Sequence, residues 1–285
     1  MIDPLLESEY NNRAKVPEHG AIMQSWKQDA AAFRATHPHC ELDLAYGDSA
    51  RQRLDLFWPD QRREGPIALF IHGGYWQALD RSWFSHLARG FIAHGVALAV
   101  PSYDLCPQVS LGTLVEQMRG AVAFLIRRHE RAVFSCGHSA GGHLTAMLLA
   151  TGWAARGLPP AAVFAGCAIS GLFDLMPLLA TSVNGALGLD VATARGLSPL
   201  FLPTPGLPLH AVVGAAEGTE YLRQSRSIAE AWGGTCDLLP GANHFTAIAP
   251  LTDPGSPIMA TMLRMIAGGL PTASADQRDR YSALP

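Results

Sequence analysis

The sequence predicts an α/β fold with a mostly parallel central sheet and helices on both faces. Continuous apolar runs alternate with longer helix-like segments along most of the chain. Such runs, without polar alternation, are typical of strands that are buried on both faces. Small and reactive residues stand where several of these runs end. Because the carboxyl ends of parallel strands meet at one edge of a sheet, the pattern also predicts a site at that edge.

The elements can be assigned in order along the chain. Residues 1–38 are expected to form a helix-containing arm, and residues 41–46 and 52–58 an antiparallel hairpin that opens the sheet. Further strands are predicted at residues 66–71, 96–100, 132–135, 161–169, 208–213 and 236–239. Helices are predicted at residues 80–94, 111–128, 143–150, 219–232 and 258–266.

Residues 175–206 break this alternation, because they contain several prolines and an Asn-Gly pair. We interpret them as a small cap-like excursion over the site within a single domain spanning residues 1–285. The polar tail, residues 269–285, is expected to be poorly ordered.

Composition narrows the class of protein. Apolar residues make up 48% of the chain and charged residues 16%, which is enough for a large core. The net charge is −3 and there is no long basic run, so nucleic acid and membrane partners are not expected. The first residues are acidic, no apolar run reaches the roughly 20 residues that span a bilayer, and the five cysteines are odd in number. These features predict a cytoplasmic protein with free thiols.

The chain is organised around Gly137-His138-Ser139-Ala140-Gly141, which lies between a predicted strand and a predicted helix. A strand that turns sharply into a helix at a serine places that serine in a strained conformation and exposes its hydroxyl. Glycines on either side allow the close approach that such a turn requires. Ser139 is therefore the predicted nucleophile.

A serine nucleophile needs a base and an acid that orients the base. Ser139, Glu217 and His244 occur in the order serine, acid, histidine, which is the order of the α/β-hydrolase arrangement. Asp174, at the end of an earlier strand, and Glu220, one turn beyond Glu217, remain alternative acids. The backbone N–H groups of Gly73, Gly74 and Ala140 are expected to form an oxyanion hole. His138 and His143 are expected to be structural.

Several motifs of this sequence occur in the same order as in a known family, and together they carry a resemblance to it. They are His72–Trp76, Gly137–Leu144, Ser170–Leu175, residues 184–190, residues 223–225 and Asn243–Phe245. On these motifs the sequence resembles, over roughly residues 10–268, the kynurenine formamidase (arylformamidase) group of the α/β hydrolases. Glu217 departs from the pattern, because the family usually has an aspartate there.

The resemblance implies hydrolysis of N-formyl-L-kynurenine, or of small aryl and alkyl esters, with no metal and no organic cofactor. Tyr75, Trp76 and Phe245 are candidates for an aromatic leaving-group pocket. Asn184 and Ser182 are candidates for binding the amino-acid end of such a substrate. A general short-chain carboxylesterase with the same triad is the alternative, and a non-catalytic ligand-binding homologue is a further one. The expected partner is a small-molecule substrate, and a homodimer is left open.

Overall fold

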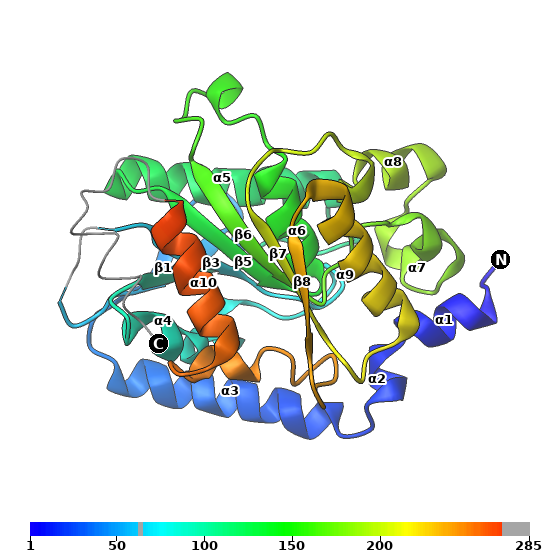
Figure 1. Cartoon of the computed structure of the whole chain (residues 1–285), viewed down its shortest axis with the longest axis horizontal. Coiled ribbons are helices and arrows are strands. Elements are labelled where there is room, and N and C mark those ends of the chain that lie inside the picture. Colours follow the sequence, from blue (N-terminus) through cyan, green and yellow to red (C-terminus); the bar gives the residue numbers. More distant parts are fainter. Residues whose placement is uncertain (62–64, 270–285) are drawn as a thin grey trace.

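The computed structural model describes residues 1–61 and 65–269, and within them one sheet contains eight strands in the order β1-β2-β4-β3-β5-β6-β7-β8 (Figure 1). The strands are β1 (Cys40–Ala45), β2 (Arg53–Phe57), β3 (Ile67–Ile71), β4 (Ala97–Pro101), β5 (Val133–His138), β6 (Val163–Ile169), β7 (Leu209–Gly214) and β8 (Thr235–Leu239). Strand β2 pairs antiparallel with β1 and with β4, and the other neighbouring pairs are parallel. The predicted sheet and its opening hairpin are confirmed.

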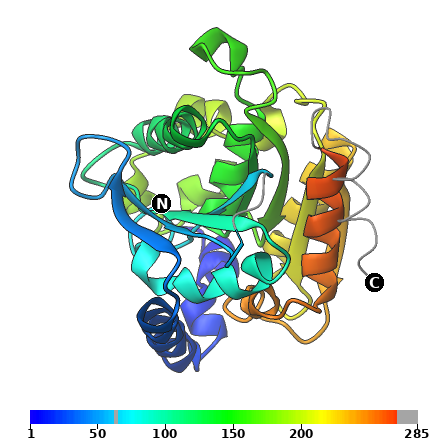
Figure 2. The same ribbon diagram turned by 90° about the vertical axis from the view of Figure 1, so that its left-hand side faces the viewer.

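Different helices cover the two faces of the sheet (Figures 1 and 2). The longer helices are α3 (His19–Thr36), α5 (Leu111–His129), α6 (Ala140–Leu149), α9 (Thr219–Trp232) and α10 (Pro257–Gly268). Alternate residues of a strand point to opposite faces. In β3, Leu69 belongs to the hydrophobic cluster that includes side chains of α5, α6 and α9, whereas Phe70 belongs to the cluster that includes side chains of α3 and α10. The sheet is therefore buried on both sides.

Helix α6 packs very closely on the centre of the sheet. A Cβ atom at Gly141 would lie 1.9 Å from the backbone oxygen of Ile71, and one at Gly137 would lie 2.2 Å from the oxygen of Gly141. Neither distance is compatible with a side chain. Both glycines around Ser139 are thus required for the close approach of α6 to β3 and β5.

We expect Gly141→Ala to lower the free energy of unfolding by about 1–3 kcal/mol or more, because the added methyl group forces α6 away from β3. Gly120→Ala, inside α5, is the matched control, because a Cβ there meets nothing within 4 Å. That control should raise stability by up to about 1 kcal/mol through helix propensity. Urea denaturation of both variants tests the pair, and equal stabilities would contradict the packing argument.

The segment predicted as one helix over residues 80–94 is interrupted. It consists of two 3-10 turns, Arg81–Trp83 and Ser85–Leu87, followed by the short helix α4 (Ala88–Ile92). Within α4 the packing on a distant segment is close, since a Cβ atom at Gly90 would lie 2.2 Å from the backbone oxygen of Leu251. Hydrophobic periodicity along the sequence carries no information about such contacts.

Two further segments are in contact with each other. The N-terminal arm contains α1 (Pro4–Tyr10) and α2 (Asn12–Lys15) before α3. Residues 175–206 contain the short helices α7 (Asn184–Leu187) and α8 (Val191–Gly196), with 3-10 turns at Met176–Ala180 and Pro199–Phe201. The N–H of Asp3 donates to the oxygen of Ala180 at 2.8 Å, which joins the arm to this excursion.

The predicted polar tail, residues 269–285, lies outside the described residues except for Gly269. Of the helices that the structure describes, none combines the length and the apolar character needed to cross a bilayer.

Candidate active site

Ser139 lies at the turn between β5 and α6, in a backbone conformation that is rare for a residue with a side chain. Its φ is 56° and its ψ is −118°, a region that glycine favours. Its N–H donates to the oxygen of Ile169 at 2.8 Å, which ties the turn to the end of β6. The turn thus presents the hydroxyl at the carboxyl edge of the sheet, where the sequence predicted a reactive residue.

The Ser139 hydroxyl contacts a histidine from the far end of the chain. Ser139 Oγ is 3.1 Å from His244 Nε2, and His244 Nδ1 is 2.7 Å from Glu217 Oε2. The other Glu217 oxygen accepts hydrogen bonds from the Gly214 N–H, at 2.8 Å, and from the Ser170 hydroxyl. The Glu217 side chain has no exposed surface. A carboxylate that is hydrogen-bonded through both oxygens in this place holds the imidazole with Nε2 facing the serine.

The two alternative acids lie elsewhere. Asp174 accepts from the Met176 N–H at 3.0 Å and lies 3.3 Å from the Arg223 guanidinium. Glu220 accepts from the Tyr10 hydroxyl at 2.7 Å and from Arg223 at 2.8 Å. Neither contacts His244, so the structure brings only Glu217, of the three acids, to the histidine.

Two elements bring backbone N–H groups close to Ser139 in the chain or in space. Gly73 follows β3, and a Cβ atom there would lie 3.0 Å from the Ser139 Cβ, so its main chain is directly against the serine. Ala140 is the first residue of α6, where N–H groups have no partner inside the helix. Among residues 1–61 and 65–269 we find no acceptor for the N–H groups of Gly73, Gly74 or Ala140. These are the three donors that the sequence predicted for an oxyanion.

Histidines surround this site in buried, neutral form. His138 Nε2 donates to the backbone oxygen of His244 at 2.8 Å, and His143 Nε2 donates to the oxygen of Leu197 at 2.8 Å. Burial, and secondly the neighbouring His244, lower the pKa of His138 well below its ordinary value. Burial likewise lowers the pKa values of His72 and His143 to about 4. His138 and His143 thus fix the backbones of the loop after β8 and of the excursion.

These histidines predict a dependence of stability on pH. An unfolded histidine binds a proton below about pH 6.5, whereas His72 and His143 stay neutral in the folded chain down to about pH 4. The unfolded state therefore binds more protons in this window, and the free energy of unfolding falls as pH decreases through it. Each histidine contributes a slope of up to about 1.4 kcal/mol per pH unit.

Urea denaturation between about pH 7.5 and 5.5 measures this slope. The variant His72→Phe removes one titrating group from a stack whose ring-centroid distances are 4.3 Å to Tyr103 and 5.8 Å to Phe84. Its stability should depend less steeply on pH than that of the wild type. If the free energy of unfolding of His72→Phe depends on pH as steeply as that of the wild type, His72 does not contribute to the pH dependence.

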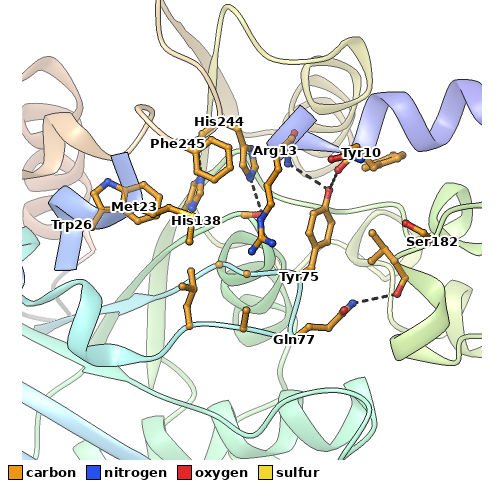
Figure 3. Close-up of a pocket in the computed structure, with 18 of the residues that line it drawn as sticks. Tyr10, Arg13, Met23, Trp26, Tyr75, Gln77, His138, Ser182, His244 and Phe245 are labelled. Carbon is orange, nitrogen blue, oxygen red and sulfur yellow. Dashed lines mark hydrogen bonds between the residues drawn. The ribbon is translucent and has the colours of Figure 1, made fainter. Parts of the chain in front are cut away.

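A cavity of about 430 Å³ opens beside Ser139 and His244 (Figure 3). One wall comes from Gly73, Gly74 and Tyr75 after β3, and another from Ser182 and Val183 of the excursion. The remaining lining residues include several from the N-terminal arm, namely Glu7, Tyr10, Asn11, Asn12, Arg13, Met23 and Trp26. Phe245 completes an aromatic side, with its ring 6.1 Å from that of Trp26.

Known proteins with related sequences point to one family. A kynurenine formamidase from Salmo salar is 29% identical over 240 residues, which cover 79% of this chain and 81% of that protein. The family model BD-FAE matches residues 54–156. A crystal structure from Silicibacter sp. TM1040, provisionally named a thioesterase, is 35% identical, has a TM-score of 0.85 and covers 90% of this chain and 98% of that one. The chain belongs to the kynurenine formamidase-like esterases.

This membership confirms the resemblance predicted from the motifs, and it makes the chain a hydrolase of the α/β-hydrolase type. The fold is shared more widely. Esterase B from Lactobacillus rhamnosis has a TM-score of 0.67 at 21% identity, covering 92% of this chain and 98% of that one.

Two of the residues predicted to bind substrate in this formamidase-like esterase do not line its cavity. Trp76 is completely buried in the core, where its ring packs edge-on against His143 with centroids 5.1 Å apart. Gly74, Tyr75 and Trp76 all have positive φ, so the chain coils tightly there and directs Trp76 inward. Asn184 uses its side chain to bond both the N–H and the oxygen of Leu189, at 2.8 and 3.1 Å. The structure thus places Trp76 and Asn184 outside the cavity lining.

Tyr75, Phe245 and Ser182 do line the cavity. The Tyr75 hydroxyl donates to the backbone oxygen of Tyr10 at 2.6 Å and lies 2.6 Å from the Tyr221 hydroxyl. It therefore connects the cavity wall to the arm and to α9.

The N-terminal arm contributes to the cavity, although the sequence predicted only a helix-containing segment there. Met23 and Trp26, which lie three residues apart on α3, both line the cavity. The available signal was the polar run Asn11-Asn12-Arg13, which forms the start of α2.

No group of three histidine, cysteine, aspartate or glutamate side chains in the described ranges is arranged to hold a metal ion.

Proposed function

We propose that this chain is a serine hydrolase that cleaves an aryl formamide, such as N-formyl-L-kynurenine, or a small ester through an acyl-enzyme on Ser139. The observation that supports it most directly is the contact from Ser139 Oγ through the imidazole of His244 to the Glu217 carboxylate. The names of the relatives, kynurenine formamidase foremost, support the choice of substrate class.

In the first half-reaction Ser139 Oγ attacks the carbonyl carbon while His244 Nε2 takes the hydroxyl proton. The carbonyl oxygen becomes an oxyanion, which the N–H groups of Ala140 and of Gly73 or Gly74 stabilise. One such donor typically contributes about 3 kcal/mol to the transition state. Glu217 stabilises the imidazolium that forms, because its carboxylate lies against Nδ1.

The intermediate then collapses, and the bond from carbon to the leaving nitrogen or oxygen breaks. His244 returns its proton to the leaving group, and the acyl group remains on Ser139 as an ester. Water enters, gives a proton to His244 Nε2 and attacks that ester. The acid leaves and Ser139 Oγ recovers the proton.

Two features support a small acyl group and a larger, aromatic leaving group. The main chain of Gly73 lies directly against Ser139 and limits the space on that side. Tyr10, Trp26, Tyr75 and Phe245 contribute aromatic rings to the lining of the cavity that extends toward the arm.

A comparison of turnover tests the proposal. Purified protein is assayed with N-formyl-L-kynurenine and with p-nitrophenyl acetate, butyrate and octanoate, with Ser139→Ala as the control for non-enzymatic hydrolysis. We expect formamide turnover and a kcat/KM that falls from acetate to octanoate, since each methylene that clashes costs about 1 kcal/mol or more. Rising activity toward longer esters, with no formamide turnover, would instead identify a general carboxylesterase.

A further inference from the structure

We infer that Arg13, on the N-terminal arm, binds a carboxylate on the substrate and so makes this hydrolase selective for formamides or esters of anionic, amino-acid-like compounds. Arg13 lines the same cavity as Ser139 and His244, and its side chain points from the arm into that cavity between His244 and Tyr75 in the view of Figure 3. The inference rests on the proposed function, because it concerns the substrate of that same site.

The Arg13 guanidinium has no partner within the described residues, in contrast to Lys15 and Arg223. Lys15, two residues on, pairs with Glu9 at 2.8 Å, and Arg223 pairs with Glu220 at 2.8 Å. No ion pair and no hydrogen bond of Arg13 occurs in residues 1–61 and 65–269. Its planar fork of donors is therefore available to a ligand, and such a fork matches the two oxygens of a carboxylate.

The backbone that carries Arg13 is held firmly on both sides. Asn12 is buried, and its amide donates to the Tyr221 hydroxyl at 2.8 Å. The Asn11 side chain accepts from the N–H of Ala14 at 3.2 Å and begins the turn of α2. An arginine on an anchored turn is positioned for recognition, because less ordering is needed when the ligand binds.

The charges that line the cavity favour this role for Arg13. His138 is neutral, as described above, and His244 is paired with Glu217, so Arg13 is the fixed cation among the described lining residues. The lining carboxylate, Glu7, accepts from the N–H and the hydroxyl of Ser182 at 2.8 and 2.7 Å. Because Ser182 binds both Glu7 oxygens, the Glu7 carboxylate is directed to the excursion and does not pair with Arg13. The Arg13 guanidinium is therefore available to bind an anion.

The expected ligand group follows from this geometry. Acyl transfer occurs at Ser139, on the side limited by Gly73, so the part of the substrate near the arm is the leaving group. We therefore expect Arg13 to bind a carboxylate on the leaving group, at the end remote from the scissile bond. An aryl formamide with an α-amino acid side chain presents such a carboxylate.

A matched pair of substrates tests Arg13. The kcat/KM for N-formyl-L-kynurenine is divided by that for its α-carboxamide, which keeps the shape and the amino group but lacks the negative charge. We expect Arg13→Gln to lower this ratio by about 10- to 100-fold, the range of one charge-assisted hydrogen-bonded pair, mainly through KM. Arg13→Lys should show a smaller loss, because it keeps the charge but not the fork. Arg226→Gln removes the same charge from an exposed position on α9 outside the cavity and should leave the ratio unchanged.

Equilibrium binding makes the test independent of turnover. Calorimetry on the Ser139→Ala background compares L-kynurenine with its α-carboxamide, with and without Arg13→Gln. If L-kynurenine binds more tightly than its α-carboxamide and Arg13→Gln removes that difference, the inference about Arg13 is supported. This holds even if neither formamide is cleaved, and in that case only the proposed function fails. Cleavage of both formamides with an unchanged ratio in Arg13→Gln overturns the inference about Arg13 and leaves the proposed function standing.

Discussion

Ser139→Ala should abolish hydrolysis, with a loss of about 10⁶ in kcat if the serine, histidine and acid act as one unit. The variant should fold, because the substitution removes only the Ser139 hydroxyl, which contacts His244 Nε2, and alanine tolerates the same backbone about as well as serine. The measurements are kcat with the best formamide or ester and the midpoint of urea denaturation.

The matched control is Ser225→Ala, which deletes the hydroxyl of another buried serine. Ser225 lies on α9 outside the cavity, and its hydroxyl has no hydrogen-bond partner in the part of the chain that the structure describes. Its turnover should equal that of the wild type. A sulfonyl fluoride should label Ser139, and mass spectrometry that finds the label on another residue would contradict the assignment of the nucleophile.

Glu217→Gln should lower kcat by about 10⁴, the effect expected when the acid of a triad no longer holds the tautomer of its histidine. In the wild type the Gly214 N–H and the Ser170 hydroxyl donate to the Glu217 carboxylate. In the variant they would face a neutral amide instead. Glu217→Asp tests the departure from the family's aspartate. It keeps the charge but shortens the side chain, so it should retain much more activity than the glutamine variant.

Asp174→Asn and Glu220→Gln are the matched controls for the acid. Both remove a carboxylate that pairs with Arg223 and does not contact His244. Each should change kcat far less than Glu217→Gln does. A severe effect of Asp174→Asn would transfer the role of the acid to the strand before the excursion.

The sequence alone was sufficient for features that depend on local chain geometry. These features are the apolar runs of strand length, the glycines on both sides of Ser139 and the small residues after β3. Each depends on residues that are only a few positions apart in the sequence. From them the parallel sheet, the serine turn and the edge of the sheet that carries the site were predicted. The segment over residues 80–94 marks the limit, because two 3-10 turns and the short helix α4 replace the one helix that was predicted there.

Only the tertiary structure decided which side chains meet. Glu217 and Glu220 lie three residues apart, and the hydrogen bonds from Gly214 and Ser170 direct one of them to His244 while Arg223 holds the other. Consecutive positive φ angles direct Trp76 into the core, although its neighbour Tyr75 lines the cavity. Arg13 is more than 100 residues from Ser139 in the sequence and reaches the cavity because Asn12 anchors the arm to Tyr221 of α9. Such contacts join residues that are distant along the chain, and periodicity and local turn preferences carry no information about them.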